Sequence, residues 1–217
     1  LASGEKYLIV ANGIVSTSGY SPAIPFDLHV FAGGRESATN GTNTDLLVCH
    51  GSTDAPAVSV WETGVGAGQL FNNFVYSDFE GYLELPTNDY VIEVRDDAGT
   101  TTVASYDAPL ATLGLQGASA VVVASGFLNP ANNSNGAGFG LWVALPSGGN
   151  LIPLPTSTAK IQVIHNSADA AASTVDVYLN GGLAIDNFAF RTATPFINVP
   201  AGVQISVAIA PSTSTSV

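Results

Sequence analysis

Short segments rich in Val, Ile, Tyr and Phe recur along the chain, separated by clusters of Gly, Pro, Asn and Asp. In many of them apolar and polar residues alternate, as in 58–61 and 175–178, which is typical of strands with one buried and one solvated face. We find no segment with the period of an amphipathic helix. The predicted strands are 7–15, 26–31, 45–50, 57–62, 69–76, 82–85, 90–95, 101–106, 118–128, 138–145, 160–165, 174–179, 183–190, 194–199 and 203–209.

Many short strands with turn residues between them predict an all-β fold of the sandwich class. We therefore expect tandem Ig-like antiparallel β-sandwich domains, each with about seven or eight strands. Sheets of this kind turn one face toward a shared core and the other toward solvent.

The chain also repeats itself, at an offset of 113 to 115 positions. The similarity covers separated blocks and keeps nearly the same offset in each, which indicates a structural repeat rather than chance. The matching blocks are 48–55 with 163–170, 73–74 with 187–188, 83–86 with 197–200, and 8–15 with 121–128.

The phase of the repeat divides the chain unevenly. Residues 44–158 form one complete copy, residues 1–43 match only the second half of a copy, and residues 159–217 match only the first half. We expect the N-terminal strands to complete the second domain, either within their own chain or in a neighbouring chain. The apolar residues of these complementing strands are Tyr7, Leu8, Ile9, Val10, Ile14, Phe26, Leu28 and Val30.

One motif occurs in both copies. Residues 48–60 read V-x-H-x-S-x-D-A-x-x-V-x-V, and residues 163–177 follow the same pattern loosely, with two extra positions. The motif resembles that of the domain of unknown function 4397 family, whose members carry H-x-S-P-D-A-P-x-V-D-V-Y, often in tandem. Thr53 and Ala168 stand where that family usually has Pro. The resemblance implies a secreted bacterial β-sandwich with no established chemistry.

The composition limits the classes of partner. Of the 217 residues, 46% are hydrophobic, which is enough for packed cores, but only 10% are charged, against about 25% in an average soluble domain. The chain has 17 acidic and 5 basic residues, and the basic ones are scattered. It therefore has no basic patch for nucleic acid or an anionic membrane, and no apolar run long enough to span a bilayer.

Other features indicate a location outside the cell. The chain starts at Leu1 and contains no Met, so we expect that a signal peptide has been removed or that the sequence is a fragment. Cys49 is the only cysteine and forms no intrachain disulfide. Asn40 and Asn132 fit the acceptor pattern for N-glycosylation. We expect the protein in the extracellular space or on a cell surface.

The shared motif contains the residue types of a hydrolase triad, which are His50, Ser52 and Asp54 in one copy and His165, Ser167 and Asp169 in the other. Their short spacing does not by itself place a nucleophile beside its base. Ser and Asp at a strand end more simply bond backbone amides in the following turn. We therefore predict a structural motif in which Asp54 and Asp169 accept backbone N–H bonds. A hydrolase is the third alternative for the function.

No cofactor site is predicted. Three histidines at unrelated positions, one cysteine and no glycine-rich phosphate loop leave no pattern for zinc, haem or nucleotide. We interpret residues 96–99 as a hairpin turn, with calcium at an acidic loop as the weaker alternative. A sugar-stacking platform is an alternative to core packing for a group of aromatic residues: Trp61, Phe71, Tyr76, Tyr82 and Tyr178.

These observations favour a structural protein over an enzyme. We expect the subunit of a surface filament, fibre or adhesin stalk that assembles from copies of itself. In a head-to-tail exchange, residues 7–15 would pair with a neighbouring chain, for which we expect the region around 203–209. A carbohydrate- or cell-surface-binding module is the alternative, and exposure of the aromatic side chains distinguishes the two.

Overall fold

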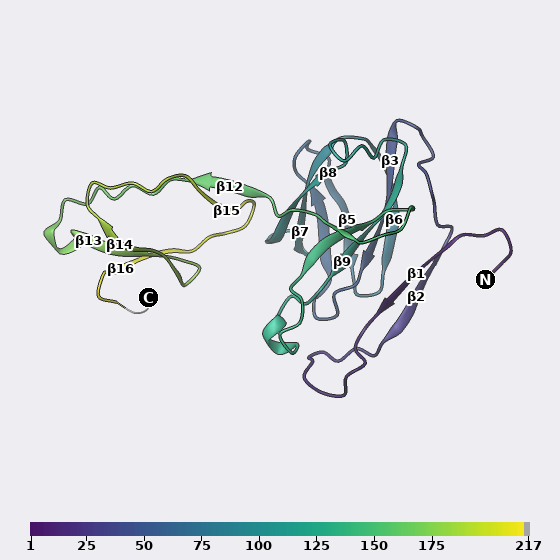
Figure 1. Ribbon diagram of the computed structural model, residues 1–217, viewed down its shortest axis with the longest axis horizontal. Helices are drawn as coiled ribbons and strands as arrows, with labels where there is room; N and C mark the ends of the chain where they lie inside the picture. Colours follow the sequence, from purple (N-terminus) through teal and green to yellow (C-terminus); the bar gives the residue numbers. More distant parts are fainter. Residues whose placement is uncertain (215–217) are drawn as a thin grey trace. The chain divides into compact units, whose positions relative to one another are not determined.

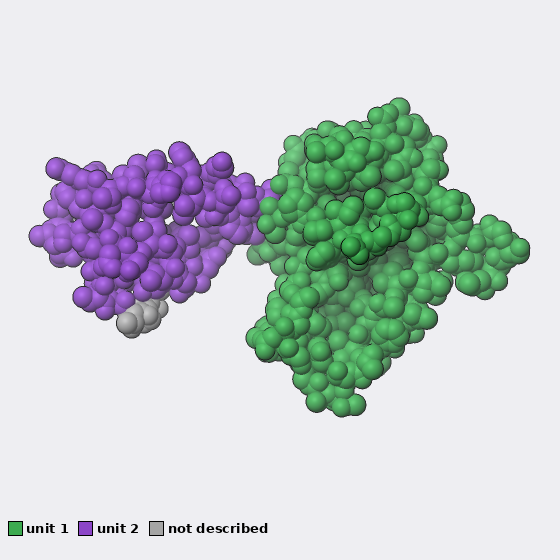
Figure 2. All heavy atoms as spheres, in the orientation of Figure 1, with its two compact units in different colours: residues 1–156 green, residues 157–217 purple. Residues whose placement is uncertain are grey.

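Strands make up nearly all of the regular structure in residues 1–214, which are the residues that the computed structural model describes (Figure 1). Two short 3₁₀ turns, η1 (Pro130–Asn132) and η2 (Ala170–Ala172), are the only helical segments of this part. The predicted all-β fold is therefore confirmed. The chain divides into two compact units, residues 1–156 and 157–217 (Figure 2).

Unit 1 contains a β-sandwich of two sheets. The larger sheet has the strand order β11 (Ile152–Pro153), β10 (Gly140–Ala144), β9 (Ser119–Ser125), β3 (Asn43–His50) and β6 (Phe79–Pro86). The smaller sheet has the order β5 (Gly68–Phe74), β4 (Val58–Glu62), β7 (Asp89–Asp96) and β8 (Thr102–Pro109).

The neighbouring strands of these sheets are antiparallel, with one exception. β3 and β9 run parallel, which the pattern of apolar residues did not predict. The chain between them passes through the whole smaller sheet and then returns to the edge of β3. Parallel neighbours require such a long crossover connection, whereas antiparallel neighbours can be joined by a tight turn.

The core of unit 1 lies between the two sheets. Alternate residues of the strands point into it, as the alternation of apolar and polar positions predicted. Burying an aliphatic or aromatic side chain of this size contributes about 1.5–3 kcal/mol. The core includes Leu46, Val58, Val60, Phe71, Phe74, Val94, Val122, Leu141 and Val143.

Two further strands of unit 1 form a separate hairpin. β1 (Tyr7–Asn12) and β2 (Asp27–Ala32) pair with each other and with no other strand of the described chain. The hairpin lies against the outer face of the larger sheet (Figure 1). The ring of Phe31 lies 5.5 Å from that of Phe79 and 6.0 Å from that of Tyr82.

Unit 2 contains two small sheets. One pairs β12 (Thr158–Ile161) with β15 (Ile197–Pro200), and the other has the order β14 (Gly182–Ala189), β13 (Thr174–Leu179) and β16 (Val207–Pro211). Its buried apolar cluster is correspondingly small, with Val175, Val177 and Phe188. The described residues of this unit form five strands, and each overlaps one of the five segments predicted between residues 160 and 209.

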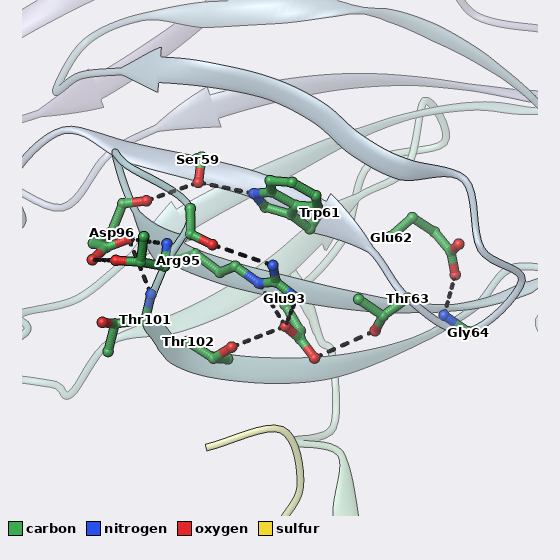
Figure 3. A network of polar contacts seen from close by, with 12 residues as sticks. Ser59, Trp61, Glu62, Thr63, Gly64, Glu93, Arg95, Asp96, Thr101 and Thr102 are labelled. Carbon is green, nitrogen blue, oxygen red and sulfur yellow. Dashed lines mark hydrogen bonds and ion pairs between the residues drawn. The ribbon is translucent and has the colours of Figure 1, made fainter. Parts of the chain in front are cut away.

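The outer face of the smaller sheet of unit 1 carries a network of polar contacts (Figure 3). The guanidinium of Arg95 lies over the ring of Trp61, 4.5 Å from its centroid, and 2.7 Å from a carboxylate oxygen of Glu93. Nε1 of Trp61 donates to Oγ of Ser59 at 3.0 Å. The carboxylate of Asp96 accepts two backbone N–H bonds within its hairpin turn.

Glu62 lies at the end of β4 and holds the loop that follows (Figure 3). Its buried carboxylate accepts N–H bonds of 2.7–3.3 Å from Gly64, Val65, Ala67 and Val91. Burial acts to raise the pKa of this carboxyl, but the four N–H donors outweigh burial and hold the pKa below its usual value. The negative charge is therefore part of the folded structure.

Replacing Glu62 by Gln should lower the free energy of unfolding of unit 1 by about 1–3 kcal/mol at pH 7. Because the folded pKa is lowered, the stabilisation by Glu62 is present above the unfolded pKa of about 4.3 and is lost as the pH falls through the folded pKa. Urea titrations over this acidic range should show that loss in the unmodified protein and not in Glu62→Gln. Glu36→Gln, in an exposed ion pair with Lys6, is the control. Equal effects of the two variants would contradict the role of Glu62.

Candidate functional site

The candidate site is an apolar face of the β1–β2 hairpin, which a comparison with the β9–β10 hairpin makes visible. The two hairpins have the same strand register, displaced by 113 positions. The isolated bridges that follow the first strand of each hairpin also correspond. Corresponding pairs are Leu8–Phe31 with Val121–Ala144, and Ile14–Pro25 with Phe127–Gly138.

One face of the two hairpins has a very different environment. In β9–β10 this face points into the core of unit 1, with Val122 8%, Leu141 6% and Val143 1% exposed. In β1–β2 the counterparts are Ile9, Leu28 and Val30, which are 51%, 53% and 51% exposed. The hairpin therefore presents to solvent a face whose copy in the same chain is core.

The structure divides the eight apolar residues that the sequence assigned to complementing strands. Leu8 and Val10 are half-buried, and they line a hollow together with Val121 and Val123 of β9. Tyr7 and Ile14 are half-buried. The exposed members are Ile9, Phe26, Leu28 and Val30.

The strands of unit 2 reproduce part of the sandwich of unit 1. The β12–β15 pair repeats the register of β3–β6, so that Ala159 opposite Val199 corresponds to Thr44 opposite Leu85. The β13–β14 pair repeats β4–β5 with both register shifts, and β13–β16 repeats β4–β7. The sheets of unit 2 contain no counterpart of β8, β9 or β10 among the described residues.

Unit 2 consequently has an open sheet edge. In unit 1, β3 has β6 on one edge and β9 on the other, whereas β12 has only β15 in the described chain. The strand predicted at 160–165 extends only to Ile161, the last residue of β12. Ile209 is 59% exposed, although its counterpart Val94 lies in the core at 5%.

The His-x-Ser-x-Asp motif of unit 1 holds the chain that leaves β9. Oγ of Ser52 donates to the carbonyl of Gly126 at 2.7 Å. The Asp54 carboxylate accepts N–H bonds from Leu128 and Asn129, each 2.8 Å long. Asp54 thus accepts backbone N–H bonds as predicted, but from a distant segment rather than from its own turn. We call these contacts of Ser52 and Asp54 the clamp.

His50 takes no part in the clamp. It is buried and its ring lies 5.3 Å from that of Phe74. Burial lowers its pKa, so the neutral form is favoured. No hydrogen bond joins His50 to Ser52 or Asp54 in the described part of the chain. The three side chains therefore do not have the arrangement of a nucleophile, its base and an orienting carboxylate.

The second copy of the motif has different bonds. His165 packs 5.7 Å from Phe188, as His50 packs on Phe74, and its Nε2 lies 2.7 Å from the carbonyl oxygen of Ala172. Asp169 accepts one bond from the N–H of Ala171, in its own turn. The hydroxyl of Ser167 has no hydrogen bond within the described residues. Ser167 and Asp169 thus hold no distant segment of the described chain, whereas Ser52 and Asp54 do.

Most of the remaining candidate residues pack against neighbours, and the two asparagines are exposed. His29 lies against Tyr76, and burial raises the pKa of the Cys49 thiol to about 12. Asn40 and Asn132 are exposed. The five aromatic residues considered for sugar stacking are all buried or half-buried against neighbours: Trp61, Phe71, Tyr76, Tyr82 and Tyr178. The described residues contain no group of His, Cys, Asp and Glu that could hold a metal, and no helix long and apolar enough to cross a membrane.

Sequence reasoning identified the residues of the clamp but not its partners. The groups that the clamp holds are a carbonyl and two N–H groups of the backbone, at Gly126, Leu128 and Asn129. Backbone groups leave no signature in side-chain identity. Alignment of the repeat sets Ile9, Leu28 and Val30 beside core residues of the other copy, but only the coordinates show that they are exposed.

Replacing Asp54 by Ala should lower the free energy of unfolding of unit 1 by about 1–3 kcal/mol, because two N–H groups lose their acceptor. Asp169→Ala is the matched control, since Asp169 makes a single local bond in the other unit. Urea denaturation followed by Trp fluorescence reports on unit 1, which contains both tryptophans, Trp61 and Trp142. An Asp54 variant as stable as the control would show that the clamp does not stabilise unit 1.

Comparisons with known proteins bear on the whole chain. Neither the curated proteins nor the solved structures that were searched gave a match. The family model of the domain of unknown function DUF4397 matches residues 44–133 and 154–217, which include both copies of the His-x-Ser-x-Asp motif. The chain therefore belongs to the DUF4397 family.

Proposed function

We propose that the protein is an extracellular structural subunit that polymerises head to tail by β-strand complementation. In this assembly the β1–β2 hairpin of one copy fills the place in unit 2 of the next copy that β9–β10 fills in unit 1. The observation that carries the proposal is the exposed face of Ile9, Leu28 and Val30, whose counterparts form the core of unit 1.

The exposed surfaces provide the driving force. Burial of an aliphatic side chain contributes about 1.5–3 kcal/mol when it is complete, and soluble monomers rarely keep large apolar faces in water. The donor hairpin and the acceptor unit both expose such side chains, among them Val30 on β2 and Ile209 on β16. The open edge of β12 adds unpaired N–H and C=O groups, which attract a further strand.

The donor hairpin is already formed and held in place. Nδ2 of Asn12 donates to the carbonyl of Gly51 at 2.8 Å, and the N–H of Ser21 donates to Oδ1 of Asn133 at 3.0 Å. A preformed donor loses less conformational entropy on binding than a disordered segment does. Hydrogen bonds to the rest of unit 1 thus hold the hairpin in a form that is ready to bind a second copy.

The geometry of a polymer follows from the two different surfaces. The hairpin and the open unit are not self-complementary, so their contact is heterologous, and two bound copies together keep one free donor and one free acceptor. Such contacts give an open filament wherever the rotation between copies does not close a ring. The small number of charged residues, 10% of the chain, supports a subunit whose neighbours are copies of itself outside the cell.

The purified chain should form filaments in negative-stain micrographs, and its mass by light scattering should rise with concentration. Val30→Asn places a polar amide in the shared core and should abolish assembly, while circular dichroism of the monomer stays unchanged because position 30 is exposed there. Val65→Asn is the control, because Val65 has a similar exposure of 54% and lies in a loop outside the proposed contact.

Two results would overturn the proposal. One is an unmodified chain that remains monomeric at every concentration tested. The other is a Val30→Asn variant that assembles as well as Val65→Asn does. A monomer in which Ile9 and Val30 are nevertheless protected from solvent would show that the hairpin completes unit 2 of its own chain. That result excludes the polymer.

A further inference from the structure

We infer that β1 of one copy binds the open edge of β12 of the next copy in parallel, with residues 6–11 beside residues 160–165. This inference rests on the proposed function and specifies its contact. Unit 1 contains the template, because β9 lies parallel to β3 with residues 119–124 beside residues 45–50. Residues of the β1–β2 hairpin precede their counterparts in β9–β10 by 113 positions. Residues of β12 follow their counterparts in β3 by 115 positions.

This register accounts for the exposed core face. It sets Ile9 beside Val163 and Ala11 beside His165, on the side where the template sets Val122 beside Val48 and Ala124 beside His50. In the template these side chains lie in the core. The corresponding side chains of the two copies would therefore close one sandwich between two molecules.

The register also accounts for the other face. It sets Ile164 of the acceptor beside Val10 of the donor, and Val10 lines the hollow over β9 together with Val121 and Val123. Ile164 is 65% exposed, whereas its counterpart Cys49 is 1% exposed. The hollow is lined mainly by apolar residues, so it offers Ile164 of the next copy a place out of water.

The clamp of the second copy provides an independent match. Ser52 and Asp54 hold the carbonyl of Gly126 and the N–H groups of Leu128 and Asn129. In the segment after β1, the corresponding groups are the carbonyl of Gly13 and the N–H groups of Val15 and Ser16. None of these three groups has a hydrogen-bond partner among the described residues. The hydroxyl of Ser167 and the second oxygen of Asp169 have none either. The donor segment after β1 thus offers the bonds that this clamp lacks.

The template favours another position for the donor than the one expected from the sequence. The region around 203–209 was expected to receive the donor, but its counterparts lie in β7, in the other sheet of the sandwich. The strand that accepts β9 is β3, and β3 corresponds to β12. The apolar pattern identified the missing strands without identifying the edge that they occupy.

Cysteine pairs test the register. Chains carrying Val10→Cys and chains carrying Ile164→Cys are mixed and assembled with a short bifunctional methanethiosulfonate, and dimers are counted on denaturing gels. We expect crosslinked dimers from this mixture and none from Val10→Cys mixed with Val207→Cys, although Val207 is similarly exposed at 62%. The native Cys49 is buried, and its raised pKa of about 12 keeps it unreactive.

Each outcome has a distinct meaning. Filaments that crosslink through position 207 instead of 164 would overturn the register and leave the proposed function standing. A chain that does not assemble at all would overturn both. A chain that carries both Val10→Cys and Ile164→Cys and crosslinks only within itself would show that the hairpin completes unit 2 of its own molecule.

Substitution at Asp169 tests the clamp. Asp169→Ser keeps a cap for the N–H of Ala171 but is too short to hold two N–H groups of a donor. We expect the concentration needed for assembly to rise about tenfold, the equivalent of 1.4 kcal/mol. Unfolding of unit 1 should not change, in contrast to the effect of Asp54→Ala. Assembly at an unchanged concentration would overturn the role of Asp169.

Discussion

The rest of the structure depends on the parallel pairing of β9 with β3. This pairing closes one edge of the larger sheet and brings Val122 of β9 into the core, while β10 adds Leu141 and Val143. The clamp then fixes the chain that leaves β9 to the chain that leaves β3. Without β9 and β10 the sandwich would have an open edge and a core exposed on one side, and the described part of unit 2 has both features. The strands β9 and β10, together with β8, thus separate the closed unit from the open one.

Much of this architecture could be predicted because it depends on local alternation. Each of the fifteen predicted segments overlaps a strand, since a half-buried strand needs an apolar residue at every second position. The parallel pair could not be predicted in this way, because its partners are joined by a long crossover and alternation carries no information on which edges meet. The two-residue strand Ile152–Pro153 was also missed, being too short to show any period. The alignment of the repeat identified the hairpin, but only the coordinates show that Ile9 is exposed and Val10 half-buried.

The two copies of the motif show that residue identity does not determine the contacts. Both histidines pack on an equivalent phenylalanine, so this part of the motif needs only its own unit. Ser52 and Asp54 bond to a segment far along the chain, whereas Asp169 bonds to its own turn. The difference lies in the presence of the distant segment, because the side chains are the same. A motif shared by both copies is therefore explained by a common role in closing a sandwich, and the second copy has that role in the proposed polymer.

The hairpin has two apolar faces, and their separate environments explain why it can connect molecules. Phe31 contacts Phe79 and Tyr82, so the inner face already packs, half-buried, against the larger sheet of its own molecule. The outer face, with Ile9 and Val30, is available. In the proposed polymer the hairpin would be at once the cover of one sandwich and part of the core of the next. A strand shared in this way would transmit force between neighbouring domains through hydrogen bonds and packing rather than through a flexible linker. For a fibre or stalk this is an advantage, because pulling a subunit out requires the exposure of a whole core face.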